Sequence, residues 1–173
     1  MIIATLDLSR FSARRVKVDW QDISVGALVD ELSRELTAAA DKPDVRLGWQ
    51  CSGDAGVLRS DPLKLKMILR NLVTNALKFT DEGRVSLDAR ANDGGVQFEV
   101  SDTGAGIPHD ALPTLFDPFT QAHGVESRRK GGAGLGLHLV HRLVEVLGGN
   151  VAVVATEVGK GSTFRVWVPR QPA

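Results

Sequence analysis

The segment ILRNLVTNALKFT, residues 68–80, constrains the fold and the chemistry of this chain more than any other part of it. Its apolar residues recur at helical spacing, which predicts an amphipathic helix with one face in a core. Beside that face, Asn71, Asn75 and Lys78 stand at i, i+4 and i+7 and therefore form one stripe. Amide oxygens can ligate Mg²⁺ and an ammonium group can bind phosphate, so the stripe suits a polyanion that carries a hard cation. For the helix by itself, a solvated polar edge is the alternative reading.

The composition places the chain among globular proteins and excludes several kinds of partner. With 173 residues, 43% of them hydrophobic, it can form one domain with a full core. Lysine plus arginine and aspartate plus glutamate both total 21, so net charge gives no reason to expect binding to nucleic acid. Cys51 is the single cysteine, which excludes an internal disulfide and suits a reducing cytoplasm. No apolar run approaches the roughly 18–20 residues needed to span a bilayer, so we expect no membrane contact, although a membrane-anchored parent protein is compatible with this.

The hydrophobic pattern predicts an α+β sandwich with helices on one face of a mixed sheet. Ser24 is a plausible helix N-cap, and Asp61-Pro62 is a typical start for the helix that carries the asparagines. Residues 1–19 have the pattern of the end of a longer helix. The other expected elements are strands at 45–51, 85–90 and 96–100, a long irregular loop over 107–134, a helix at 135–147, and a final hairpin with strands at 151–155 and 163–168.

Asp102 ends a strand on the same face as three apolar residues. Period-2 spacing places its carboxylate beside Val96, Phe98 and Val100, toward the core. The sequence after it, TGAGIP, has glycines that let a flat ligand approach the backbone. A buried acceptor next to such a gap suits the exocyclic amine of a purine. An aspartate that caps its own turn explains the pattern equally well.

Two further glycine clusters follow along the chain. Residues 131–137, GGAGLGL, run directly into a helix, where backbone N–H groups favour an anion such as phosphate. Residues 159–164, GKGSTF, form a tight loop between strands and by themselves suggest no more than a turn. Neither cluster has the Walker A spacing, and no G-x-G-x-x-G occurs, so the two commonest nucleotide-binding loops are excluded.

Taken in order, these motifs resemble those of a known family. NLVTNALKFT, DTGAGIP, LFDPFTQA, GGAGLGL and GKGSTF are similar to the N, G1, F, G2 and G3 boxes of sensor histidine kinases. They belong to the catalytic ATP-binding domain, which has the GHKL or Bergerat fold, a two-layer sandwich with a mostly antiparallel sheet and a long ATP lid. The resemblance covers about residues 20–170. Residues 6–16, LDLSRFSARRV, resemble the end of the family's dimerisation and phosphotransfer helix.

The resemblance implies ATP and Mg²⁺ as ligands and a role for each matching residue. Asn75 would bind the Mg²⁺ with help from Asn71, and Lys78 would neutralise phosphate charge. Asp102 would accept a hydrogen bond from the adenine amine. Phe116 and Phe119 would anchor the lid, although plain hydrophobic packing would also explain them. Arg128, Arg129 or Lys130 would reach the γ-phosphate, and Asn71, Lys78, Arg128 and Arg129 form the expected catalytic set. The remaining expected nucleotide contacts are Phe79, Gly104, Gly106, Ile107, Gly132, Gly134, Leu135, Gly136, Leu137 and Thr163.

One position favours histidine phosphorylation over ATP hydrolysis. Relatives that hydrolyse ATP carry a glutamate one turn before the Mg²⁺-binding asparagine, and here that residue is Asn71. An amide cannot take a proton from water, whereas a neutral imidazole already presents a nucleophilic lone pair. Ala133 replaces the usual threonine of the second glycine box, which keeps a degenerate nucleotide-binding or protein-interaction module as the alternative function. Met67 replaces a common glutamine, which we interpret as surface variation.

The phosphoacceptor histidine is expected on another domain. None of His109, His123, His138 and His141 lies in the H-E-[LI]-R-x-P-like context of the family's acceptor. The resemblance therefore implies two protein partners, namely the dimerisation and histidine-phosphotransfer domain of the same kinase and a downstream response regulator receiver domain.

Overall fold

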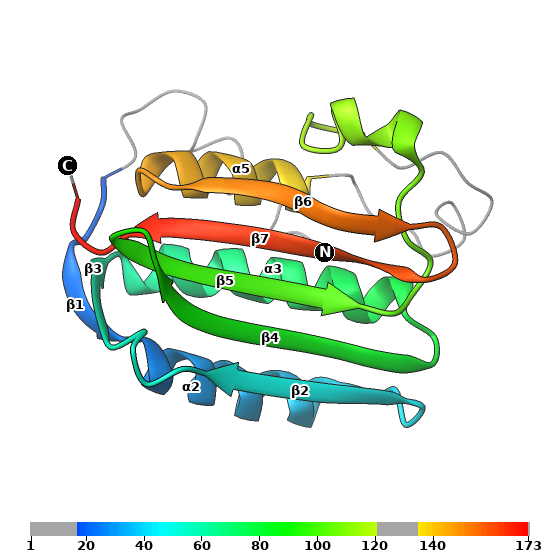
Figure 1. The fold of residues 1–173 in the computed structure, drawn as a ribbon, viewed down its shortest axis with the longest axis horizontal. Helices are drawn as coiled ribbons and strands as arrows, with labels where there is room; N and C mark the ends of the chain where they lie inside the picture. Colours follow the sequence, from blue (N-terminus) through cyan, green and yellow to red (C-terminus); the bar gives the residue numbers. More distant parts are fainter. Residues whose placement is uncertain (1–16, 121–134, 173) are drawn as a thin grey trace.

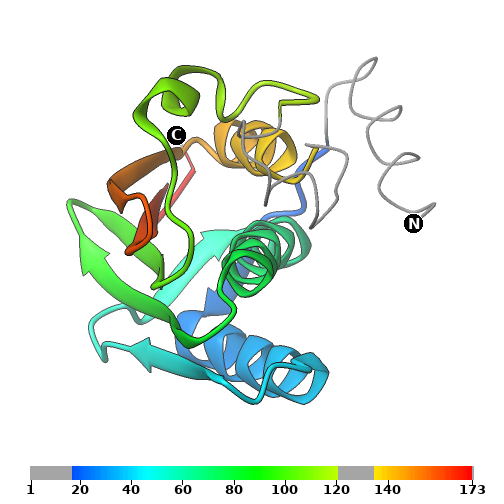
Figure 2. The same ribbon diagram turned by 90° about the vertical axis from the view of Figure 1, so that its right-hand side faces the viewer.

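The computed structural model of the chain describes residues 17–120 and 135–172, and these form two layers. A sheet makes one layer, and three long helices pack against one of its faces (Figures 1 and 2). No helix in the described ranges has the length and apolarity needed to span a bilayer. The expected α+β architecture is confirmed.

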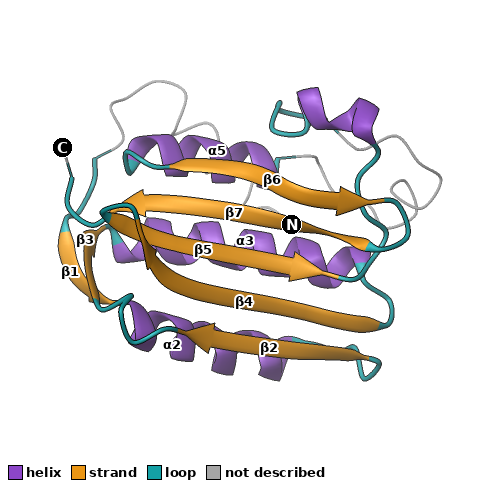
Figure 3. Ribbon diagram, viewed as in Figure 1, coloured by secondary structure: helices purple, strands orange, loops and turns teal. Residues whose placement is uncertain are grey.

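The main sheet has five strands in the order β2-β4-β5-β7-β6. Only β2 and β4 run parallel, and the other neighbours are antiparallel, as Figure 3 shows. The strands are β2 (Val45–Cys51), β4 (Gly83–Asn92), β5 (Gly95–Asp102), β6 (Asn150–Glu157) and β7 (Gly161–Pro169). The mixed, mostly antiparallel sheet is therefore as expected.

The two faces of the sheet differ in chemistry because successive side chains point to opposite sides. The inner face is apolar, and Leu87, Phe98 and Val166 on it are at most 1% exposed. The outer face carries charges, among them Glu99, which accepts a 2.8 Å hydrogen bond from Nε of Arg165 on the neighbouring strand. This alternation of apolar and polar residues is the pattern from which the strands were predicted.

Three helices cover the apolar face. They are α2 (Val25–Ala39), α3 (Pro62–Phe79) and α5 (Gly136–Val146). Ser24 caps α2 and accepts from the Ala27 N–H, as its sequence position predicted. The buried residues of α3 recur at helical spacing, and all six are at most 6% exposed: Leu65, Ile68, Leu69, Leu72, Val73 and Ala76. The central helix is thus held by burial of the predicted face.

Three regular elements were missed by the sequence analysis. Strands β1 (Gln21–Ser24) and β3 (Val57–Ser60) pair as a separate antiparallel sheet of two strands. Each is only 4 residues long, so neither shows enough alternation to be recognised. The 3₁₀ helix η1 (His109–Thr114) occupies part of the segment that was expected to be an irregular loop. Short 3₁₀ turns lack the apolar periodicity of α-helices, which explains the omission.

Asp61 at the start of α3 supplies a pH-dependent part of the stability. It is 2% exposed, accepts from the Lys64 N–H at 3.0 Å and forms an ion pair with the Lys64 side chain. Burial alone would raise the pKa of this carboxyl, but its hydrogen bonds with Lys64 and Asp19 outweigh burial and hold the pKa below its usual value.

Asp61→Asn is therefore expected to lower the free energy of unfolding by about 1.5–3 kcal/mol at neutral pH. Because the folded pKa is depressed, the contribution of Asp61 is complete above the unfolded pKa of about 3.9 and is lost as the pH falls through the folded pKa. Urea unfolding of both proteins between neutral and acid pH measures this difference. A gap that stayed constant down to the lowest pH at which both proteins fold would contradict the assignment.

Candidate nucleotide-binding site

The predicted site residues that the structure describes gather mainly at one end of the molecule. This end carries the C-terminus of α3, the loop after β5, the turn between β6 and β7, and the N-terminus of α5 (Figure 1). Asn75, Lys78, Asp102 and Gly136 all lie on these elements although they are far apart in the sequence.

Asp102 is half-buried at the end of β5, opposite Ser162 of β7. Its Oδ1 accepts from the Gly104 N–H at 2.9 Å, and its Oδ2 accepts from the Ser162 hydroxyl at 2.8 Å. The turn-capping role that the sequence allowed is therefore present. Carboxylate oxygens have further lone pairs, so the same side chain retains capacity to accept from a ligand amine. Its adenine contact stays a prediction.

The loop after Asp102 packs directly against the end of α3. The Ala105 N–H donates to the Phe79 carbonyl at 3.0 Å. A Cβ at Gly104 would lie 2.2 Å from that carbonyl oxygen and 2.7 Å from Oγ1 of Thr80, so only glycine fits here. The Thr80 hydroxyl is buried and has no partner among the described residues. A polar atom without a partner at this position suits a site that binds a polar ligand or water.

The loop between β6 and β7, which contains the third glycine cluster, is hydrogen-bonded to the loop that follows Asp102. The Gly159 N–H donates to the Ala105 carbonyl at 2.8 Å, and the Ile107 N–H donates to Oγ1 of Thr156 at 2.8 Å. Gly106 has a φ of 68°, and a Cβ there would lie 2.1 Å from the Glu157 carbonyl oxygen. The loop between β6 and β7 is therefore a structural support for the Asp102 loop, which its sequence alone did not indicate.

The amides of α3 face the beginning of α5. Nδ2 of Asn71 donates to the Met67 carbonyl one turn earlier, at 2.8 Å. A Cβ at Gly136 would lie 3.3 Å from Oδ1 of Asn71 and 3.9 Å from Nδ2 of Asn75. The predicted metal-binding stripe and the end of the second glycine cluster are thus adjacent, and an amide oxygen lies at their junction. This donor set fits Mg²⁺ bound through amide oxygens and ligand phosphates.

Lys78 lies one turn after Asn75 and is half-buried. Its Nζ is 4.9 Å from the centre of the Phe79 ring. Burial lowers the pKa of Lys78, because a charged amine loses hydration there. Binding of a phosphate would compensate that loss, so the position suits an anion.

Two other predicted contacts of the site are hydrophobic. Leu135 is 9% exposed, and its carbonyl accepts from the Leu139 N–H at the start of α5. Leu137 is partly buried and packs against the core. Both residues hold the beginning of α5 in place.

Thr163 lies on the opposite face of the sheet from Asp102, and Phe119 is largely exposed. The Thr163 hydroxyl bonds to that of Ser101 at 2.9 Å, on the strand position next to the Asp102–Ser162 pair and therefore on the opposite face. Phe119 is 72% exposed with a φ of 63°. By contrast, Phe116 packs edge-on against Phe164 with ring centres 6.5 Å apart, which is the plain hydrophobic packing that the sequence also allowed.

Some predicted contacts fall outside the described residues. These are Arg128, Arg129, Lys130, Gly132 and Gly134, together with the unusual Ala133. Their roles stay predictions.

Sequence reasoning missed two polar groups of the site, Ser162 and Thr80. Ser162 contacts Asp102 because β5 and β7 pair in a register that places the two residues opposite each other. Register between strands 60 residues apart leaves no local signal. Thr80 ends the motif KFT, and only the packing of Gly104 against it shows that its hydroxyl borders the site.

A hollow of about 520 Å³ also exists on the sheet, but it lies elsewhere. Its lining consists of Gln50, Cys51, Ser52, Asp88, Ala89, Arg90 and Glu99. None of these is a predicted site residue, so this hollow is not the candidate nucleotide site.

The sequence of the chain also matches a known protein family, in agreement with the fold and the arrangement of these motifs. Residues 60–172 match the family described as "Histidine kinase-, DNA gyrase B-, and HSP90-like ATPase", and the chain belongs to this family. Within it, the relatives below show that the chain is an ATP-binding catalytic domain of the sensor histidine kinase type.

Three relatives illustrate the similarity. The circadian input-output histidine kinase CikA of Synechococcus elongatus is 38% identical over 169 residues, which cover 96% of this chain and 22% of CikA. The sensor protein DivL of Caulobacter vibrioides is 39% identical over 165 residues, which cover 95% of this chain and 20% of DivL. The crystal structure of full-length ShkA in complex with AMPPNP matches with a TM-score of 0.86 and 32% identity, over 98% of this chain and 35% of ShkA. The chain thus spans about a fifth of the length of CikA and of DivL.

Proposed function

We propose that this domain binds Mg²⁺-ATP and transfers its γ-phosphoryl group to a histidine on a separate dimerisation and phosphotransfer domain. The observation that carries the proposal is the juxtaposition of Asn71 and Asn75 with Gly136, where the amides of α3 meet the N-terminus of α5. This end of a helix favours negative charge, and the amide oxygens favour a hard cation.

Each group has a defined task in this proposal. Asn75 holds the metal ion, which when bound neutralises charge on the phosphates and keeps them aligned. Lys78 contributes a second positive charge from a half-buried position. Its attraction to a phosphate is stronger there than it would be in water. Asp102 orients the base, and the Ser162 hydroxyl fixes the carboxylate. Catalysis is then mostly positioning and charge neutralisation, as phosphoryl transfer requires.

Asn71 supports histidine as the acceptor rather than water. Its amide already donates to the Met67 carbonyl and cannot act as a general base. Water would need such a base, whereas a neutral imidazole attacks with its own lone pair. Slow ATP hydrolysis and efficient transfer to imidazole are therefore expected from the same site.

The reaction can be tested with γ-labelled ATP, Mg²⁺ and a histidine phosphotransfer domain added as a separate chain. The proposal expects acid-labile label on the added domain and none on the histidines of this chain by mass spectrometry. Steady phosphate release without transfer would instead indicate an ATPase. Nucleotide binding with neither reaction would indicate a degenerate binding module.

Asp102→Asn is expected to weaken ATP binding about tenfold or more, because an amide can present its NH₂ group where the adenine amine needs an acceptor. The fold should persist, since Asn also forms the turn bond to the Gly104 N–H. Calorimetric titration with an ATP analogue measures the change. Ser101→Ala is the matched control because that hydroxyl lies one residue away and bonds Thr163 instead. Equal affinities for the Asp102 variant and the unchanged protein would exclude the adenine contact.

The wider setting is part of the same proposal. We propose a cytoplasmic location, supported by the single cysteine, Cys51, which is exposed and free. The proposed protein partners are the phosphotransfer domain of the same kinase and a response regulator receiver domain, and both rest on the family resemblance.

A further inference from the structure

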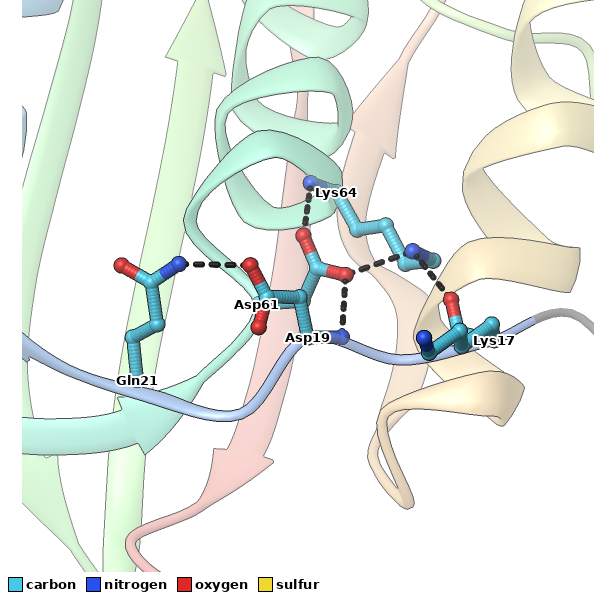
Figure 4. Close-up of polar contacts among 5 residues, drawn as sticks. All are labelled: Lys17, Asp19, Gln21, Asp61 and Lys64. Atoms are coloured by element: carbon cyan, nitrogen blue, oxygen red, sulfur yellow. Dashed lines mark hydrogen bonds and ion pairs between the residues drawn. The ribbon is translucent and has the colours of Figure 1, made fainter.

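An ion pair at the beginning of α3 ties the chain that enters the domain to the nucleotide-binding helix (Figure 4). Oδ2 of Asp61 accepts from the Asp19 N–H at 3.0 Å and from the Lys64 side chain. Nζ of Lys64 also donates to the Lys17 carbonyl at 2.9 Å. The pair therefore binds two backbone groups, two residues apart, in a segment more than 40 positions earlier in the sequence.

Burial distinguishes this pair from the other ion pairs among the described residues. The side chains of Lys64 and Asp61 are 13% and 3% exposed, whereas those of Arg59 and Asp22, on the neighbouring small sheet, are 50% and 66% exposed. An exposed pair contributes little, but removal of one partner from a buried pair leaves a charge without compensation. The structure thus holds the entering segment with groups that are costly to separate.

The entering segment is also ordered by packing. Val18 and Trp20 pack against the core, while Lys17 and Asp19, which alternate with them along the chain, are exposed. Asp19 accepts a further hydrogen bond from Nε2 of Gln21 at 2.6 Å. Apolar contacts thus fix one side of the segment, and the ion pair fixes its backbone on the side toward α3.

We propose that Asp61 and Lys64 are a positioning pair, which sets the direction in which the chain before residue 17 leaves the domain relative to α3. Asn71 and Asn75 lie further along this same helix. The pair therefore controls how the bound nucleotide is presented to a phosphoacceptor domain that is joined through this segment. This inference rests on the proposed phosphotransfer function.

Hydrogen exchange of the chain tests the contact itself. Asp61→Asn keeps an oxygen for the helix cap but loses the ion pair, and exchange of the Asp19 amide should become about tenfold faster or more. Protection of the buried amides of α3 should change only by the overall loss of stability. Lys64→Gln should reproduce the effect, and Asp22→Asn, which removes the exposed pair between Asp22 of β1 and Arg59 of β3, should not. Unchanged exchange of Asp19 in both pair variants would overturn the proposal.

Phosphotransfer in two arrangements tests the positioning role. A histidine phosphotransfer domain is joined ahead of Met1 in one arrangement and added as a separate chain in the other. Asp61→Asn should lower the transfer rate about tenfold when the domains are joined and leave it within twofold when they are separate, with nucleotide affinity unchanged. Equal losses in both arrangements, or a loss of nucleotide affinity, would show that Asp61 acts only through the nucleotide site or the fold and would overturn the proposal. Absence of transfer by the unchanged protein in both arrangements would refute the proposed function instead, while the exchange of Asp19 still decides whether the pair holds the segment.

Discussion

Asn75→Ala is expected to abolish the Mg²⁺-dependent part of nucleotide affinity while the domain remains folded. Asn75 is half-buried on α3, beside Asn71 and the first residue of α5, Gly136. Loss of a group that merely orients a metal ligand typically costs about 10–100-fold in metal affinity, so loss of the ligand itself should cost at least about 100-fold. Alanine is a good helix former, and the apolar face of α3 is unaffected, so the free energy of unfolding should change little.

Thr74→Ala is the matched control for this experiment. Thr74 is exposed on the same helix, and its hydroxyl bonds to the Arg70 carbonyl one turn earlier. Titration of both variants with an ATP analogue, with and without Mg²⁺, should separate them clearly. If Asn75→Ala bound the analogue as tightly as Thr74→Ala in the presence of Mg²⁺, the metal assignment would be refuted.

Gly161→Ala is expected to destabilise the domain by about 3–5 kcal/mol and to weaken nucleotide binding as well. Gly161 has a φ of 108°, which a residue with a Cβ rarely adopts. The added Cβ would also lie 1.9 Å from the Asp102 carbonyl oxygen, so the backbone that carries the proposed adenine-binding residue would have to move. Strain and collision therefore act together at the point where the loop between β6 and β7 supports the Asp102 loop.

Gly159→Ala separates the two effects. Gly159 has a φ of 80°, yet a Cβ there would meet nothing within 4 Å. Strain alone should cost about 1–2 kcal/mol, and nucleotide affinity should be nearly unchanged. Urea unfolding and nucleotide titration of both variants provide the comparison. Equal destabilisation by the two substitutions would mean that the contact with Asp102 has no energetic importance.

The sequence was most informative where periodicity and chemistry coincide. The apolar spacing of residues 68–80 predicted both the buried face of α3 and the stripe that contains Asn71 and Asn75, because a regular helix fixes both together. The hairpin of β4 and β5 could also be predicted from the sequence. Asp93 and Gly94 adopt φ values of 45° and 73°, as the turn sequence Asn-Asp-Gly-Gly suggests.

Other features depend on contacts between distant segments. The bond between Ser162 and Asp102 follows from strand register, and the ion pair that holds Lys17 and Asp19 follows from the path of the chain past α3. Neither has a periodic signal. The sequence motif predicted a contact at Thr163, but the alternation of side chains along β7 places Ser162, and not Thr163, on the same face as Asp102.

Calorimetric titration of the unchanged chain with a non-hydrolysable ATP analogue, with and without Mg²⁺, tests the central assignment most directly. The account predicts binding in the micromolar range that depends on Mg²⁺, because the amides of α3 and the N-terminus of α5 form the phosphate end of the site. Absence of binding by a chain whose folding has been verified by circular dichroism would contradict the account and identify the domain as a degenerate member of its family.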